Sequence, residues 1–136
     1  DGVLKAYDYN GTQAPEFTTF FGLYDRYYSF GKKEPWNLTQ KWLDAENKIN
    51  KSTKLNYVTT HDIIGGNSGS AMINQKGQVV GLIFDGNIES LPGRYIYDTS
   101  SNNRCVAVHS NAILESLRSV YKAGRLADEL QYSKIK

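Results

Sequence analysis

Cysteine is almost absent from this sequence. Cys105 is the only one among 136 residues, so an internal disulfide is excluded. It lies in the strand-like segment 104–108, where a buried thiol is expected rather than a reactive one. Histidine is also scarce. The two histidines and the one cysteine do not have the spacing of zinc ligands. No apolar run approaches the ~20 residues that a membrane-spanning helix needs, so no membrane span is expected.

An excess of charge of one sign is absent too. The 16 basic and 14 acidic residues are interspersed and give a formal net charge of +2. Without a basic face, a nucleic-acid partner is not expected. What is present is sufficient apolar material, 40% hydrophobic residues with ten tyrosines among them, to build the core of one domain.

The first residues do not look like the start of a protein. Asp1 is followed by a strand-like alternation, with no initiating methionine and no signal-peptide pattern. We therefore expect residues 1–136 to be a piece of a longer protein, whose remainder is a partner of this piece.

The densest local signal is the segment 65–70, which reads GGNSGS and lies between two apolar, strand-like stretches. Glycines gather where the backbone must adopt positive φ or come close to a ligand. A serine in such a turn displays its hydroxyl, and nearby amides are free to bind an oxyanion. We interpret Ser68 as a nucleophile and the N–H groups of Gly66 and Ser68 as oxyanion donors. Alternatively, the segment is only a flexible connection.

The residues after Ser68 indicate the scaffold that carries it. An α/β-hydrolase nucleophile elbow reads G-x-S-x-G and runs into a helix, whereas position 70 here is serine. Instead, a strand at 71–74, a turn at 75–77 and a second strand at 78–84 are predicted. The serine is therefore expected on an all-β scaffold.

A second unusual stretch follows that strand. In a chymotrypsin-like protease the end of this strand lines the substrate cleft, so Asp85 and Gly86 would border a bound peptide. A carboxylate there could pair with the α-ammonium of a peptide that ends two residues before the scissile bond, which would make the protein an exopeptidase. The alternative is that Asp-Gly is an ordinary turn signal.

Other elements are less distinctive. The aromatic segment 17–24 has a mixed period that fits neither helix nor strand. Further strands are expected at 55–60, 95–98 and 104–109. A helix from Asn37, with a capping box completed by Gln40, and a C-terminal helix that Ser110 caps and Gly124 ends are also expected.

Two motifs, TTHDIIGGNSGS at 59–70 and GLIFDGNIESLPGRY at 81–95, resemble the bacterial chymotrypsin-like dipeptidyl-peptidases, which include dipeptidyl aminopeptidase BII and dipeptidyl-peptidases seven and eleven. The resemblance implies a mostly β fold: the C-terminal half of a chymotrypsin-like double β-barrel, with a short internal helix and a C-terminal helix. Residues 1–136 would then form the C-terminal part of a serine peptidase catalytic domain that lacks the segment carrying the catalytic His and Asp.

The resemblance also implies roles for individual residues. Ser68 matches the family's nucleophile, and Asp85 matches the residue that holds the substrate's amino terminus. Gly86 stands where members that cut after acidic residues carry arginine, while members with an apolar or mixed preference carry glycine. We therefore expect release of N-terminal dipeptides through an acyl-enzyme on Ser68, with an apolar or broad preference before the cut and no cofactor or metal. The piece alone is expected to be inactive.

Three residues and two alternative functions remain open. Asp62 stands six residues before Ser68, where trypsin-like endopeptidases place the acid that selects lysine or arginine. His61 replaces an asparagine of the family pattern. Neither His61 nor His109 is assigned as the general base, because in the chymotrypsin-like order His and Asp precede Ser by long stretches. The second alternative is a non-catalytic β-barrel that binds peptide ends.

The remaining expectations concern partners and location. Peptide substrates are the expected ligands. The family resemblance suggests the periplasm or the surface of a bacterium, and a homodimer of the parent protein is a further expectation.

Overall fold

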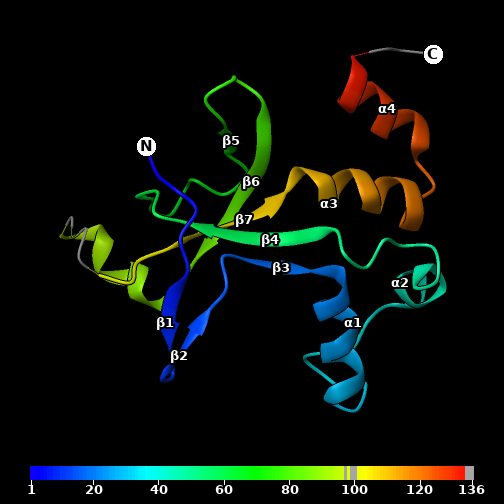
Figure 1. Cartoon of the computed structure of the whole chain (residues 1–136), viewed down its shortest axis with the longest axis horizontal. Helices are drawn as coiled ribbons and strands as arrows, with labels where there is room; N and C mark the ends of the chain where they lie inside the picture. The colour runs from blue at the N-terminus through cyan, green and yellow to red at the C-terminus, as the bar shows by residue number, and fades with distance from the viewer. Residues whose placement is uncertain (97, 99–100, 134–136) are drawn as a thin grey trace. The chain divides into compact units, whose positions relative to one another are not determined.

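The computed structural model describes residues 1–96, 98 and 101–133. The chain forms two compact units, each built from two stretches of sequence (Figure 1). The first unit comprises residues 1–18 and 55–110, and the second comprises residues 19–54 and 111–136. Within the described residues, no helix is both long enough and apolar enough to cross a membrane.

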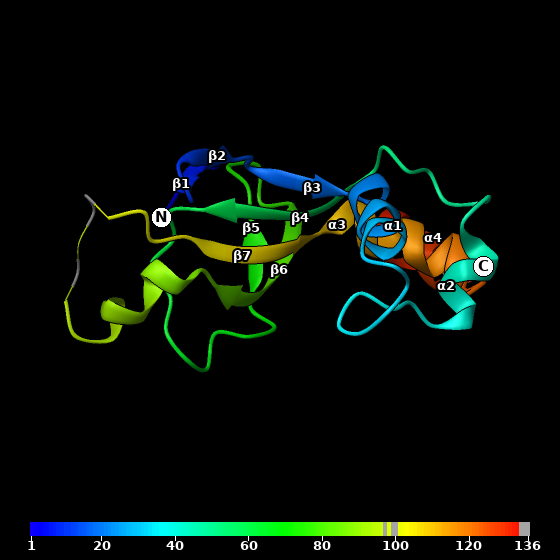
Figure 2. The same cartoon turned by 90° about the horizontal axis from the view of Figure 1, so that it is seen from below.

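The first unit is built from strands. A short hairpin, β1 (Tyr7–Tyr9) and β2 (Thr12–Ala14), turns at Asn10 and Gly11, both of which have positive φ. A five-stranded sheet with the order β3-β4-β7-β6-β5 follows, in which Figure 2 shows β3, β4 and β7 side by side. Its strands are β3 (Phe17–Thr19), β4 (Lys54–Thr59), β5 (Ala71–Ile73), β6 (Val79–Gly86) and β7 (Cys105–His109).

The core of this unit lies against the centre of the sheet. β4, β7, β6 and β5 pair antiparallel in that order, and their inward side chains form one apolar cluster. Its buried members are Tyr57, Met72, Ile83, Cys105 and Ala107. The alternation of β-branched and aromatic residues in β4 fits this half-buried surface. The mostly β fold expected for this part of the chain is confirmed.

A 3-10 helix, η1 (Ile88–Arg94), follows β6 and is held by the residue before it. The side-chain amide of Asn87 donates to the carbonyl of Asn102 at 2.7 Å, and its oxygen accepts from the backbone N–H of Arg104 at 2.7 Å. These bonds fasten the start of η1 to the segment that leads into β7.

The second unit is helical. Its core forms where α1 meets α2: Phe20 and Tyr24 are buried, and the Tyr24 hydroxyl donates to the carbonyl of Trp42 at 2.7 Å. The helices are α1 (Phe20–Ser29), α2 (Gln40–Ala45), α3 (Ser110–Glu115), the π-helical turn η2 (Ser116–Val120) and α4 (Gly124–Tyr132). A single internal helix was expected, so α1 is an addition.

Several local predictions were wrong. The capping box is not formed, because α2 begins only at Gln40, after Thr39, with no side-chain cap. Gly124 starts α4 instead of ending a helix, since the chain already breaks at Lys122, whose φ is 55°. No strand forms at the described positions 95, 96 and 98; residue 97 of that prediction lies outside the described residues.

Candidate active site

The loop between β4 and β5 turns on two glycines and is fastened to the sheet. Gly66 has φ 105° and Gly69 has φ 88°, conformations that residues with a Cβ rarely adopt. Asn67 closes the turn, because its side-chain oxygen accepts from Ile64 N–H at 2.9 Å. The amide of Gly69 then donates to the carbonyl of Ile83 in β6 at 2.7 Å. The predicted need for glycine in this loop is confirmed.

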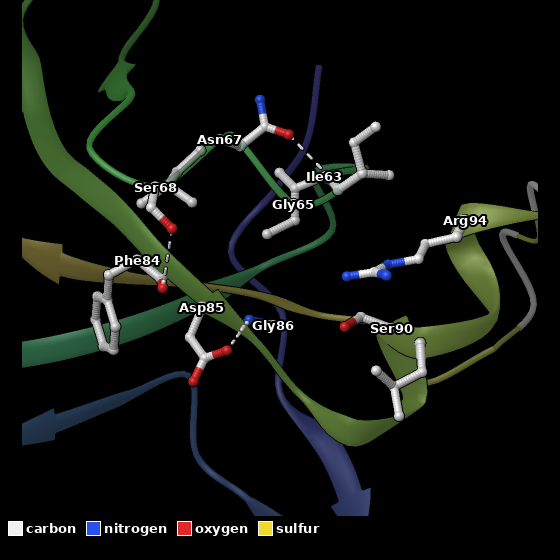
Figure 3. Close-up of a pocket in the computed structure, with 12 residues that line it drawn as sticks. Ile63, Gly65, Asn67, Ser68, Phe84, Asp85, Gly86, Ser90 and Arg94 are labelled. Atoms are coloured by element: carbon white, nitrogen blue, oxygen red, sulfur yellow. Dashed lines mark hydrogen bonds between the residues drawn. The ribbon is translucent and has the colours of Figure 1, made fainter.

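Ser68 lies exposed at the outer edge of this turn. Its hydroxyl makes one long hydrogen bond, 3.5 Å, to the carbonyl of Phe84 (Figure 3). Within the described part of the chain, the backbone amides of Gly66 and Ser68 donate no hydrogen bond, whereas those of Gly69 and Ser70 do. The turn therefore presents a lightly held hydroxyl and two available amides.

Strand β6 brings Asp85 and Gly86 beside that serine. A register shift between Ile83 and Asp85 leaves Phe84 without a partner on β7, which is a β-bulge, a feature common beside active sites. The bulged residue is the one whose carbonyl faces Ser68. Asp85 follows immediately, exposed, and its carboxylate accepts from the N–H of Gly86 at 2.8 Å.

Gly86 is needed for close packing. A Cβ at this position would collide with the Oγ of Ser90 and lie 3.1 Å from its Cβ. That hydroxyl is engaged, because it donates to the carbonyl of Asn87 at 2.6 Å. Ser90 from η1 therefore occupies the space that a side chain at position 86 would need.

One pocket of about 180 Å³ gathers most of these residues. It contains Ser68, Asp85 and Gly86 as the sequence predicted, while Gly66 is not part of its wall. Figure 3 shows Arg94 reaching it from η1, which sequence reasoning missed. The full lining is Ile63, Ile64, Gly65, Asn67, Ser68, Ile83, Phe84, Asp85, Gly86, Ser90, Leu91 and Arg94. The only sequence signal for the η1 residues was the motif 81–95.

Asp62 and His61 are not in this pocket. Asp62 lines a different one, of about 370 Å³, together with Asp1 and Arg104. The Nδ1 atom of His61 lies 2.8 Å from the hydroxyl of Thr59, and burial, with a smaller contribution from the positive N-terminus, lowers the pKa of its imidazole. The second histidine, His109, packs edge-on against Tyr57.

The environment of Cys105 and the placement of possible metal ligands can be described directly. Cys105 is fully buried in the core of the first unit, and burial raises the pKa of its thiol. The interpretation of this residue as an unreactive strand thiol fits that environment. Among the residues that the structure describes, no three His, Cys, Asp or Glu side chains gather closely enough to hold a metal ion.

A known protein family matches almost the whole chain. The family model described as Peptidase S46 matches residues 1–132. The chain belongs to the Peptidase S46 family. The resemblance seen in the two motifs is therefore confirmed over almost the whole sequence.

Curated members of Peptidase S46 match shorter parts of the chain. Dipeptidyl-peptidase 7 of Phocaeicola vulgatus is 42% identical over 74 residues, which is 54% of this chain and 10% of the relative. The Asp/Glu-specific dipeptidyl-peptidase of Shewanella putrefaciens is 35% identical over 88 residues, 65% of this chain and 12% of the relative. The matched part of the chain thus spans about a tenth of the length of these curated relatives.

A solved structure of this family shows the same fold. The crystal structure of Porphyromonas endodontalis DPP11 in complex with the dipeptide Arg-Asp matches 96% of this chain and 20% of its own, with a TM-score of 0.79 and 22% sequence identity. A second crystal structure of Porphyromonas endodontalis DPP11 matches with the same TM-score. The β-rich fold with accompanying helices is therefore that of a segment of this Peptidase S46 member.

Proposed function

We propose that the full-length protein is a serine exopeptidase that releases N-terminal dipeptides from peptides. The single observation that carries the proposal is the meeting of Ser68 and Asp85 in one pocket. A nucleophile and an anion that binds an amino terminus are the two groups that a dipeptide-releasing site needs at a fixed separation. The names of the curated relatives agree with this activity.

The chemistry proceeds through an acyl-enzyme on Ser68. The Ser68 oxygen attacks the scissile carbonyl, and its proton passes to a general base supplied by the remainder of the protein, since His61 and His109 are engaged elsewhere. The amides of Gly66 and Ser68 stabilise the oxyanion. The leaving amine departs with a proton, and water then hydrolyses the ester and frees the dipeptide.

Asp85 sets the length of the released product. Its carboxylate is exposed and, in the part of the chain that the structure describes, accepts a hydrogen bond only from the adjacent Gly86 amide, so it is available to an incoming α-ammonium. In this proposal, a peptide anchored there extends over two residues to place its scissile carbonyl at Ser68. An endopeptidase substrate would cover the carboxylate and remove it from water without offering it an amino group, and this disfavours such a substrate.

The preference at the residue before the cut is proposed to be broad and to include apolar side chains. Most of the wall is apolar, with Ile63, Ile64, Ile83, Phe84 and Leu91 contributing. Gly86 provides no charge of its own. A trypsin-like preference based on Asp62 is disfavoured, because that carboxylate lines another pocket.

Two experiments on the full-length protein test Ser68 as the nucleophile and Asp85 as the residue that binds the substrate's amino terminus. A fluorophosphonate probe should label the wild type and the Ser70→Ala control, but not Ser68→Ala. Asp85→Asn should lower kcat/KM on peptides with a free amino terminus by about 10- to 100-fold, since a charge-assisted hydrogen bond contributes about 1.5–3 kcal/mol. Asp62→Asn is the matched control and should leave kcat/KM unchanged.

The result that contradicts the proposal is a folded protein whose Ser68 does not react. That outcome would favour the alternative of a non-catalytic domain that binds peptide ends. Equal rates on free and N-acetylated peptides would refute the role of Asp85 while leaving Ser68 as a nucleophile. Efficient cleavage after lysine or arginine that disappears in Asp62→Asn would favour the trypsin-like alternative.

Two proposals about the whole protein rest on the family alone. We propose a location in the periplasm or at the bacterial surface, which fractionation of cells would test. A homodimer of the full-length protein is the second proposal, and light scattering of the purified protein would measure it.

A further inference from the structure

Among the residues that the structure describes, Arg94 is the one cationic residue in the wall of the Ser68 pocket. It is the last residue of η1, and Figure 3 shows its side chain extending from that helix toward the middle of the pocket, between Gly65 and Ser90. Its Nη2 atom lies 3.5 Å from the point where a Cβ of Gly65 would stand. The guanidinium therefore reaches across to the serine loop from the opposite wall.

This guanidinium is not used to hold the fold together. Within the described part of the chain, no ion pair or hydrogen bond engages Arg94. The nearby Arg104 is a useful contrast, because it is buried and donates to the carbonyls of Lys5, Ala6 and Asn103 at 3.0, 2.9 and 2.7 Å. Arg104 is a structural arginine, whereas Arg94 offers its donors to a ligand.

The charges of the pocket match a ligand that carries both signs. Among the described residues that line it, only Asp85 and Arg94 are charged, and the others are apolar or neutral. If Asp85 takes the α-ammonium of a peptide, a carboxylate on the same peptide would find Arg94. A guanidinium binds a carboxylate through two parallel N–H···O bonds, which fixes direction as well as charge.

We propose that Arg94 is a specificity residue that binds a carboxylate of the peptide substrate. The inference rests on the proposed function and narrows its substrate range. Within a broad preference, acidic peptides should bind more tightly, because η1, and not position 86, supplies a cation for their carboxylate. Two sources offer this carboxylate, the side chain of an acidic residue before the cut and the free C-terminus of a short peptide.

Steady-state kinetics of the full-length protein separate the two sources. The first arm compares dipeptidyl fluorogenic amides with Asp or Glu before the cut against the neutral isosteres Asn and Gln, which all lack a terminal carboxylate. The second arm compares tripeptides with free and amidated C-termini. Arg94→Gln removes the charge, Arg94→Lys retains it, and Arg125→Gln, an exposed arginine outside the pocket, is the matched control.

The expected result is selective. Arg94→Gln should lower kcat/KM on the carboxylate-bearing member of one pair by about five- to tenfold, the range of a partly exposed bidentate pair. Activity on the neutral member should stay within about twofold, Arg94→Lys should recover part of the loss, and Arg125→Gln should change neither. A purely structural role for Arg94 would reduce both members equally.

A binding measurement keeps this inference separate from the proposed catalysis. Calorimetry of acidic and amide dipeptides binding to the Ser68→Ala protein requires no turnover, and Arg94→Gln on that background should remove the advantage of the acidic dipeptide. Unchanged acidic-to-neutral ratios in both kinetic arms and in calorimetry would overturn the role of Arg94. Absence of labelling and turnover with the binding preference intact would instead refute the peptidase proposal alone.

Discussion

Replacing Gly86 with arginine tests both the packing and the specificity of the pocket. The backbone at Gly86 is outside the left-handed region, so the obstacle is space rather than conformation. A Cβ would collide with Ser90 Oγ and lie 3.1 Å from Ser90 Cβ. If Ser90 rotates away, its 2.6 Å hydrogen bond to Asn87 is lost, about 0.5–1.5 kcal/mol. If it cannot rotate, overpacking costs about 1–3 kcal/mol.

We therefore expect Gly86→Arg alone to destabilise this unit by about 1–3 kcal/mol and to give little gain on acidic substrates. The double variant Gly86→Arg, Ser90→Gly removes the obstructing side chain, so it should be more stable than the single one and should favour acidic residues before the cut. Gly65→Ala is the control for the stability measurement alone, because its Cβ would meet only Arg94 Nη2 at an ordinary 3.5 Å.

Denaturant unfolding and kcat/KM on matched acidic and neutral substrates provide the readouts. The reasoning is refuted if the single variant is as stable as the wild type, or if removing the Ser90 side chain gives no improvement over it. An unchanged substrate ratio in a stable double variant would mean that position 86 does not face the residue before the cut.

Two further predictions concern the turn and the core. Gly66→Ala should strain the turn by about 1–3 kcal/mol, because φ at this position is 105°, although the space around an added Cβ is empty. The strain should displace the oxyanion-binding amide and lower kcat by on the order of 100-fold, with little change in KM. An unaltered kcat would argue against a role for this amide. Burial raises the pKa of Tyr57 to about 12, so the native state holds this proton more tightly than the unfolded state. The stabilisation is complete below pH 10 and is lost between pH 10 and 12; Tyr57→Phe should lack that loss in alkaline unfolding curves.

The sequence was sufficient where the signal is local. Positive φ at Gly66 and Gly69 follows from the glycine-rich turn, and alternation predicted β4, β5 and β6 within one or two residues. The two motifs were sufficient to predict that Ser68 and Asp85 belong to one functional site. Their roles in the chemistry remain predictions that labelling and kinetics will decide.

The sequence was insufficient where a neighbour decides the conformation. The aromatic segment 17–24 has no single period because it divides at Thr19, whose hydroxyl accepts from Gly22 N–H at the start of α1. Lys122, and not Gly124, takes the left-handed conformation that ends η2.

The η1 residues were missed for a related reason. Ser90 and Arg94 reach the pocket only because Asn87 ties the start of η1 to Arg104, which lies far along the chain. No spacing rule encodes that contact.

The bulge at Phe84 in β6 reverses the side of the strand to which each later side chain points. Ile83 pairs with Ala107 but Asp85 pairs with Val106, so two residues that would share a side of a regular strand point to opposite sides. In a regular strand, with Phe84 paired to Val106, Asp85 would pair with Cys105 and its carboxylate would be aimed at the apolar interior beside Cys105 and Ala107. Restoring a regular strand at Phe84 would therefore turn the Asp85 carboxylate away from the pocket, and it would also disturb the serine turn, because Ser68 donates to the carbonyl of Phe84 and Gly69 donates to that of Ile83.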